Sequence, residues 1–151
     1  MQKKYLQSQF ETQQYKNQAN LVYMGTVVLG FILSIFTFFY IGSIFISSVN
    51  LVGSIVSLLS IYLNKSGKYA FSSLLYLGYI TFSTTVHTIV FGLTAGFQYY
   101  FFNLSGLIMF TNWSKSQKLM GAIIQGVLFI SLFFYSINST PLIELNYSLT
   151  I

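Results

Sequence analysis

Two long stretches without a charged side chain constrain this sequence more than any other feature. The first runs from Leu21 to Asn64, 44 residues, and the second runs from Tyr69 to Ser114. A helix crosses the hydrocarbon core of a bilayer with about 20 residues, so each stretch is too long for one span and fits two. Only 6% of the residues are charged, whereas soluble domains carry about 25%. The sequence therefore predicts an all-α, polytopic integral membrane protein.

Glycine and polar residues divide both stretches. The first is interrupted between residues 42 and 50, and the second at Gly92-Leu93-Thr94-Ala95-Gly96. A further apolar run follows Lys118. We expect a polar segment at 1–20, a membrane domain at 21–137 and a tail at 138–151. Within the membrane domain we expect five helices, at about 22–41, 47–63, 70–91, 97–113 and 119–137. The polar segment is interpreted either as an amphipathic helix on the membrane surface or as a tail.

The basic residues predict the orientation. All seven are lysines, and in a five-helix zigzag they fall before the first helix, between the second and third, and between the fourth and fifth. Because Lys and Arg accumulate on the cytoplasmic side, the N-terminus is expected inside and the C-terminal tail outside. A cell membrane that the chain crosses several times is the expected location. The lysines are Lys3, Lys4, Lys16, Lys65, Lys68, Lys115 and Lys118.

The lipid bilayer is the expected partner of these loops. Lysines paired in short loops beside apolar helices are typical of contacts with anionic head groups, so nucleic-acid binding is not expected. Aromatic residues close to the expected helix ends fit an interfacial belt. They are Tyr23, Tyr62, Tyr69, Trp113 and Tyr135.

The chain is poor in catalytic groups. It has one histidine, no cysteine, and only Glu11 and Glu144 as acids. Paired carboxylates, a nucleophile relay and a cluster of metal ligands are all missing from such a set. We expect no enzymatic activity, no metal and no cofactor.

One polar group in the third expected helix stands out as a candidate site. His87 lies near its outer end, and ionisable groups inside spans are costly and often functional. Gln98, Tyr99 and Asn103 follow at the start of the fourth helix and could line a pocket with it. Two interpretations stay open. His87 either binds a small ligand or a proton, since imidazole titrates near neutral pH, or is a structural residue hydrogen-bonded to Gln98, Tyr99 or Asn103.

Small residues suggest close helix packing at two places. Gly53 and Ser57, and likewise Ala122 and Gly126, are four residues apart, a spacing that lets helices approach closely. Packing within the chain is one interpretation, and a homodimer or partner membrane helices is the other.

The region from Leu63 to Thr111 resembles a bacterial membrane sensor domain. The resemblance rests on the basic hairpin Asn64-Lys65-Ser66-Gly67-Lys68, the span ending in His87, and the segment Ala95-Gly96-Phe97-Gln98-Tyr99-Tyr100. Such multi-helix domains precede nucleotide cyclase, GGDEF diguanylate cyclase or histidine kinase catalytic domains. They usually have six helices, whereas five are expected here, and the residues of a catalytic domain are missing.

The resemblance implies a sensory input module, either acting alone or as a truncated remnant. The module would sense a small ligand, a lipid or a proton near the outer face. Two alternatives from other classes remain: a channel or transporter subunit, and a scaffold subunit of a membrane complex.

Overall fold

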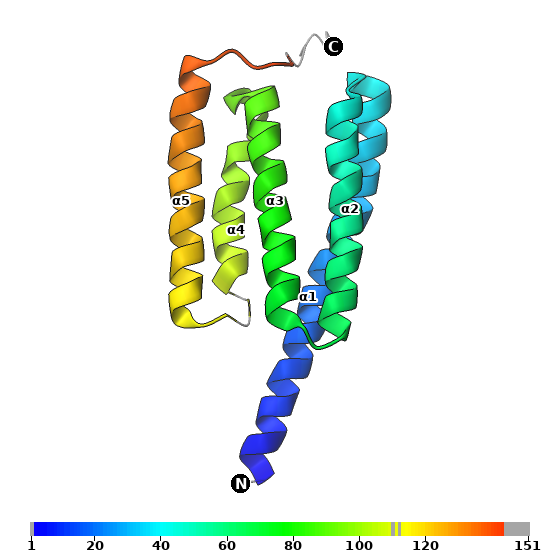
Figure 1. The fold of residues 1–151 in the computed structure, drawn as a ribbon, viewed down its shortest axis with the longest axis vertical. Helices are drawn as coiled ribbons and strands as arrows, with labels where there is room; N and C mark the ends of the chain where they lie inside the picture. Colours follow the sequence, from blue (N-terminus) through cyan, green and yellow to red (C-terminus); the bar gives the residue numbers. More distant parts are fainter. Residues whose placement is uncertain (1, 110, 112, 144–151) are drawn as a thin grey trace, which may run out of the picture. The chain divides into compact units, whose positions relative to one another are not determined.

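The computed structural model of the chain is helical, with no strand among the residues that it describes (Figure 1). Those residues are 2–109, 111 and 113–143, with side chains from Gln13 onward except that of Thr94. The chain forms two compact units. The first comprises Met1–Ile80 and Phe110–Ser114, and the second comprises Thr81–Met109 and Lys115–Ile151.

The first unit is built on two antiparallel helices that lie side by side (Figure 1). α1 spans Gln2–Phe36 and continues into a π-helical turn at Thr37–Ile41, and α2 spans Ile44–Lys65. Gly42 separates them with a φ of 72°, a left-handed conformation that glycine adopts without steric cost. The Ser43 hydroxyl then caps α2. The predicted break is confirmed, but it is shorter than expected because α2 already begins at residue 44.

The first helix begins well before the predicted residue 22. α1 begins at Gln2 and passes through Asn20 without interruption. Residues 2–24 contain no glycine or proline and are rich in glutamine and lysine, which are good helix formers. Among the described side chains, which begin at Gln13, the stretch Gln13–Ile41 is long and apolar enough to cross a membrane. The polar residues from Gln2 to Asn20 are therefore helical and continuous with the first span.

The third helix contributes to both units. α3 spans Tyr69–Phe91, close to the predicted 70–91, and follows a turn in which Gly67 has a φ of 82°. Its first half belongs to the first unit and its second half, from Thr81, belongs to the second.

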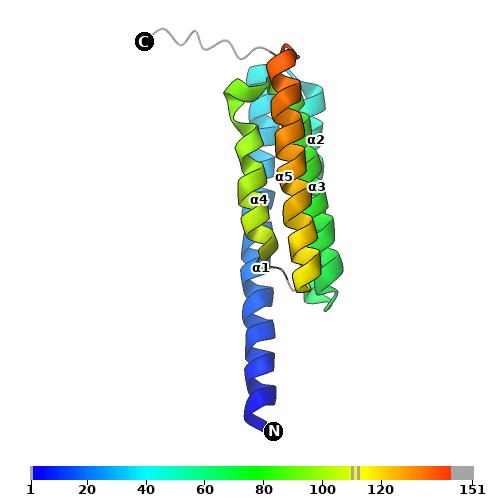
Figure 2. The ribbon, with the colours of Figure 1, turned by 90° about the vertical axis from the view of Figure 1, so that its left-hand side faces the viewer.

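In the second unit, two short 3-10 turns lead from α3 to a helical pair. The turns are η2 at Leu93–Ala95 and η3 at Phe97–Tyr99. α4 spans Tyr100–Met109 and α5 spans Lys115–Asn138, and the two lie side by side (Figure 2). The predicted helix at 119–137 is confirmed as α5, which begins one turn earlier.

The prediction of five full spans is wrong in its count. Among the described residues, four helices are long and apolar enough to cross a membrane: Gln13–Ile41, Ile44–Lys65, Tyr69–Phe91 and Lys115–Asn138. α4 has 10 residues and so a length of about 15 Å, half of the hydrocarbon core of about 30 Å. The expected helix at 97–113 begins later than predicted because residues 97–99 form a 3-10 turn, and residues 110 and 112 at its other end lie outside the described residues.

Although α4 is short, the chain reverses its direction between the end of α3 and the start of α5. The amide of Ile143, after α5, donates a hydrogen bond of 3.0 Å to the carbonyl oxygen of Val90, in the last turn of α3. The C-terminal ends of α3 and α5 are therefore at the same end of the second unit. The segment between them, with α4 in it, must return from that end to the start of α5.

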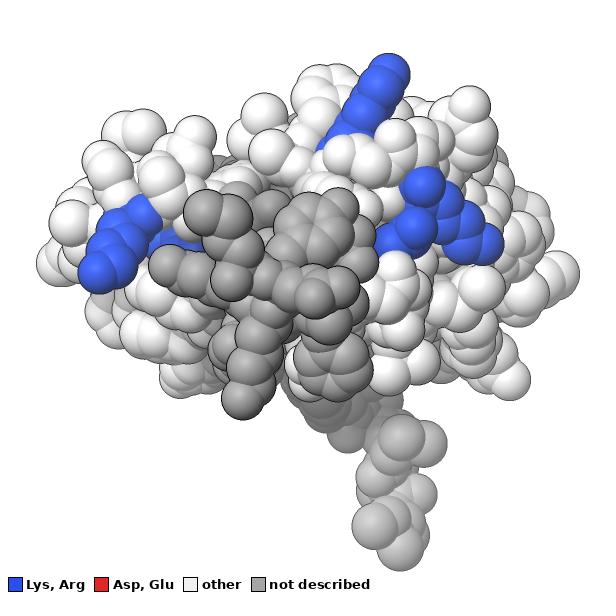
Figure 3. Space-filling view, turned by 90° about the horizontal axis from the view of Figure 1, so that it is seen from below, with Lys and Arg blue, Asp and Glu red and all other residues white. Residues whose placement is uncertain are grey.

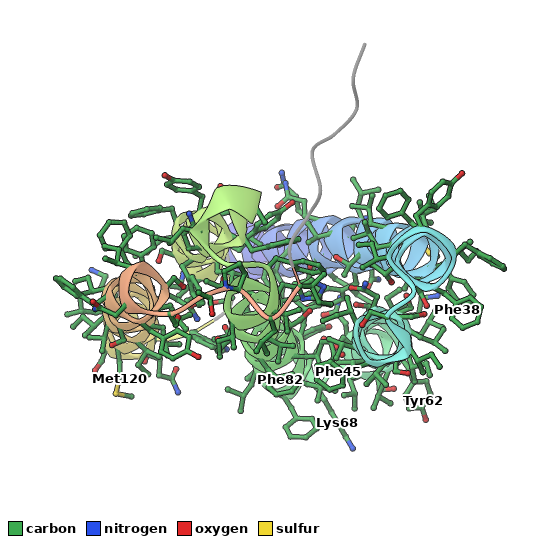
Figure 4. The ribbon with its side chains drawn as sticks, turned by 90° about the horizontal axis from the view of Figure 1, so that it is seen from above. Phe38, Phe45, Tyr62, Lys68, Phe82 and Met120 are labelled. Atoms are coloured by element: carbon green, nitrogen blue, oxygen red, sulfur yellow. The ribbon has the colours of Figure 1, made fainter. Side chains whose placement is uncertain are left out.

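Both units bury polar side chains as well as apolar ones and expose many large apolar side chains. On α2, Ser54 and Ser60 are fully buried, whereas Ile55 and Leu58 are about half exposed. Figure 4 shows the labelled Phe45 and Tyr62 of the first unit pointing outward, as do the labelled Phe82 and Met120 of the second. Such a surface suits lipid rather than water. The pattern and the four long apolar helices confirm the predicted class, an all-α multi-pass membrane protein.

The basic side chains lie at helix ends. Lys65 ends α2, Lys68 precedes α3 and Lys115 begins α5. The Lys118 ammonium donates a hydrogen bond of 2.8 Å to the carbonyl oxygen of Met109, at the C-terminus of α4, where a positive charge is favourable. In the end view of Figure 3, lysines are seen and no acidic side chain appears among the described residues.

Candidate functional site

The candidate site lies in the second unit, where α3 ends. Gly92 ends the helix with a φ of 72°, and its amide donates a hydrogen bond of 2.9 Å to the carbonyl oxygen of Thr88. Gly96 has a φ of 75° and links the two 3-10 turns. The predicted break at residues 92–96 is confirmed. It brings η3 back against the last turns of α3.

His87 is buried in this end of the unit, with 6% of its surface exposed. Its Nδ1 lies 2.7 Å from the carbonyl oxygen of Ser83, one turn earlier in α3. A carbonyl oxygen can only accept, so Nδ1 carries the hydrogen and Nε2 of the neutral ring is an acceptor. The expected hydrogen bond from His87 to Gln98, Tyr99 or Asn103 does not form. His87 bonds to its own helix instead.

Aromatic rings hold the imidazole in place. The His87 ring centroid is 4.9 Å from that of Phe97 and 6.0 Å from that of Phe91. Phe91 and Phe97 stack on each other at 5.6 Å. The imidazole is thus fixed between α3 and η3 by ring contacts and one backbone hydrogen bond.

Gln98 is the second buried polar group of this cluster. It follows Phe97 in η3 and is 3% exposed. Its Nε2 donates a hydrogen bond of 3.1 Å to the carbonyl oxygen of Leu93, which fixes the orientation of the amide. Its Oε1 is buried and has no hydrogen-bond partner. Such a buried unpartnered group costs about 1–3 kcal/mol, and in native proteins it calls for an explanation.

The open hydrogen-bonding positions of His87 and Gln98 are mainly acceptors. Oε1 of Gln98 and Nε2 of the neutral imidazole can each accept a hydrogen bond, whereas His87 Nδ1 and one hydrogen of Gln98 Nε2 are already bonded to backbone carbonyls. The chemistry matches a small molecule with N–H or O–H groups, or a proton on His87. Among the described residues there is no group of three or more metal-ligating side chains.

The other two predicted site residues lie elsewhere. Tyr99 is 61% exposed and contacts the ring of Phe129 in α5 at 6.5 Å. Asn103 is exposed on α4. The structure therefore buries His87 and Gln98 at the same end of the second unit, with Phe97 in contact with His87 and directly before Gln98, and leaves Tyr99 and Asn103 at the surface.

The polar neighbours on α3 mostly satisfy their own helix. The Thr88 hydroxyl donates to the carbonyl oxygen of Thr84 at 2.8 Å, and the Thr85 hydroxyl donates to that of Thr81 at 2.9 Å. Gln125 of α5 is buried and bonds through Nε2 to the Thr81 hydroxyl at 2.8 Å. Gln125 thus ties α5 to α3. An alanine side chain at the neighbouring Gly126 would meet nothing within 4 Å.

Sequence reasoning missed a second polar feature, in the first unit. One face of α2 buries five polar side chains, which we call the α2 seam. Gly53 lies on the same face against the Tyr79 ring, so the packing of Gly53 and Ser57 within the chain is confirmed. The signal was a polar residue every three or four positions, which predicts one helix face. The seam residues are Asn50, Ser54, Ser57, Ser60 and Asn64.

The α2 seam is hydrogen-bonded to its neighbours in the first unit. The Ser54 hydroxyl donates to the carbonyl oxygen of Val27 in α1 at 3.1 Å. The Ser72 hydroxyl of α3 donates to the carbonyl oxygen of Ser60 at 2.7 Å. Hydrogen bonds between helices thus add to the apolar packing of this unit.

Comparison with protein-family descriptions, curated protein sequences and solved structures finds no match for this chain.

Proposed function

We propose that the protein is a sensory input module of a bacterial cytoplasmic membrane, without catalytic activity of its own. It binds a small hydrogen-bond donor at the cluster of His87 and Gln98, near the outer face. The orientation is N-terminus inside and C-terminus outside. The support for this orientation is the position of the lysines, which stand in the loops expected to be cytoplasmic.

One observation carries the proposal: Gln98 Oε1 is buried without a partner, one residue after Phe97, whose ring contacts the His87 imidazole. A purely structural role for this pair predicts that its polar atoms are satisfied within the protein. The unpartnered oxygen and the accepting imidazole nitrogen together suit a ligand that supplies two donors. Ammonium, primary amines and small polyols have this chemistry.

A sensor also needs a part that responds. The residues after α5 are held to the end of α3 by the hydrogen bond from Ile143 to Val90, next to Phe91 of the aromatic stack. We call the segment that makes this hydrogen bond the strap. A ligand that binds with unequal affinity to the states in which the bond is made and broken would shift the balance between them. The response is a change in this strap, transmitted to α5.

Binding is tested on the full chain in lipid nanodiscs with ammonium, ethanolamine and glycerol as probes. We expect at least one probe to raise the midpoint of thermal unfolding in a saturable way. The same probe should change hydrogen exchange at the Ile143 amide. Gln98→Met removes Oε1 and should abolish both effects, whereas Asn103→Ala, at an exposed position, should keep them.

Two outcomes would count against the proposal. If no probe gives a saturable shift in the wild type, the cluster does not bind small donors. If Gln98→Met and Asn103→Ala respond to a probe equally, binding occurs elsewhere. Binding without any change at Ile143 would reject the proposed response.

A further inference from the structure

A second set of unpartnered polar atoms lies in the first unit, far along the sequence from the proposed sensor cluster. Three side chains of the α2 seam each have one buried atom without a hydrogen-bond partner: Asn50 Nδ2, Ser57 Oγ and Asn64 Oδ1. Their exposed fractions are 7%, 1% and 0%. The three positions are seven residues apart, so they lie on one face of α2 at intervals of about two turns.

The surroundings of these atoms are already hydrogen-bonded to one another. Asn64 Nδ2 donates to the carbonyl oxygen of Lys16 at 3.0 Å and to Asn20 Oδ1 at 2.8 Å. Asn64 Oδ1 has no partner in this network. The Ser60 hydroxyl is bonded to the carbonyl oxygen of Val56 at 2.9 Å. The unpartnered atoms are therefore left over by a network that is otherwise satisfied.

The mixed character of the three atoms identifies the ligand class. Asn50 Nδ2 is a donor, Asn64 Oδ1 is an acceptor, and the Ser57 hydroxyl can be either. A cation could not satisfy the amide donor, and an anion could not satisfy the amide oxygen. Water both donates and accepts, and buried water typically satisfies polar groups of this kind.

We propose that the α2 seam binds internal water molecules at Asn50, Ser57 and Asn64, between α2 and the helices packed against it in the first unit. Ser54 and Ser60 lie between the three positions on the same face of α2, and the Ser72 hydroxyl of α3 is bonded to the carbonyl oxygen of Ser60. The seam is then a hydrated layer inside the membrane domain. This inference is independent of the proposed sensor cluster, which lies in the other unit.

Water-edited solid-state NMR of the full chain in lipid bilayers tests the proposal. Magnetisation transfer from water to the Ser57 signals is compared with transfer to Ile55 and Leu58, which lie on the exposed face of α2. We expect transfer to Ser57 and Asn50 to build up several-fold faster than to the two exposed residues. Equal build-up rates would overturn the proposal.

A stability measurement gives a second, independent readout. If Ser57 binds water, Ser57→Ala removes a partner from the network and should lower the midpoint of thermal unfolding. If the hydroxyl is instead dry and unpartnered, Ser57→Ala removes an unfavourable buried group and should raise the midpoint or leave it unchanged, and the proposal fails. Ser66→Ala, an exposed serine at the end of α2, is the control for loss of a hydroxyl.

Discussion

The Ile143 amide and the Val90 carbonyl oxygen lie 3.0 Å apart and join the segment after α5 to the last turn of α3. Pro141 sits at the same junction, against Gly92. A carbonyl in the last turn of a helix has no partner within the helix, so the strap also satisfies one of these groups. The direction of the chain through the second unit follows from this one contact.

Gly92 is the position at which this junction is most sensitive to substitution. Its φ of 72° is left-handed, and a Cβ there would lie 3.3 Å from Pro141 Cβ. The left-handed conformation alone costs a residue with a Cβ about 1–2 kcal/mol. We expect Gly92→Ala to lower the thermal midpoint in nanodiscs. Gly106→Ala in α4, where a Cβ meets nothing within 4 Å, should be neutral. Equal midpoints for the two variants would show that the junction tolerates a side chain.

The proposed orientation can be measured with single cysteines, because the chain has none of its own. Ser66, Ser116 and Thr140 are exposed and suit replacement by cysteine. Labelling with a membrane-impermeant maleimide should reach Ser66→Cys and Ser116→Cys from the cytoplasmic side, and Thr140→Cys only from the outside. Labelling of Ser66→Cys and Ser116→Cys from opposite sides would exclude the return of the chain through the α4 segment.

Sequence reasoning found the long helices because absence of charge over a span length is a property of composition alone. It placed α3 within one residue at its start and at Phe91 at its end. It failed at α4, because composition does not distinguish an α-helix from 3-10 turns in an apolar segment that follows two glycines. It also assigned Tyr23 to an interfacial belt, whereas Tyr23 is 4% exposed and packs on the Tyr76 ring at 4.6 Å. That contact depends on a partner about 50 positions away.

The candidate site was half predictable for a similar reason. His87 was found because an ionisable residue inside an otherwise apolar span can be recognised from the sequence alone. Gln98 and Tyr99 are adjacent in η3, and a 3-10 turn directs neighbouring side chains about a third of a turn apart. One is therefore buried and the other exposed. The sequence could not show which of the two residues is buried, since both side chains carry polar groups.

The unpartnered Gln98 oxygen predicts a conflict between binding and stability. Gln98→Met keeps the side-chain length, loses the hydrogen bond to Leu93, and removes the buried Oε1. The bond contributes about 0.5–1.5 kcal/mol, and the unpartnered oxygen costs about 1–3 kcal/mol. Without any probe, we expect the thermal midpoint of the variant to equal or exceed that of the wild type. A clear loss of stability would mean that Oε1 has a partner in the membrane.

Close contact between α1 and α2 gives another test. A Cβ at Gly30 would lie 3.0 Å from the carbonyl oxygen of Asn50 and would also meet the Ser54 hydroxyl. Because a backbone atom cannot move aside, Gly30→Ala should push the helices apart, with a cost of about 1–3 kcal/mol. Gly25→Ala, in the same helix with nothing within 4 Å, is the matched control. If both variants unfold at the same temperature, α1 and α2 do not approach each other closely at Gly30.

Asn64 links α2 to α1 through hydrogen bonds that its amide nitrogen donates. Substitution by aspartate replaces this nitrogen with an oxygen and therefore tests the link. Its Nδ2 faces two acceptors, the carbonyl oxygen of Lys16 and Asn20 Oδ1. In Asn64→Asp an oxygen replaces the donor nitrogen, so acceptors face acceptors in a buried place, and we expect a loss of more than about 2 kcal/mol. Asn17→Asp introduces the same charge on exposed α1, where Asn17 only accepts a hydrogen bond from Gln13. Its stability should change little. A small effect of Asn64→Asp in the same thermal assay would mean that water or a lysine reaches the aspartate, and that the Asn64 end of the α2 seam is open to solvent.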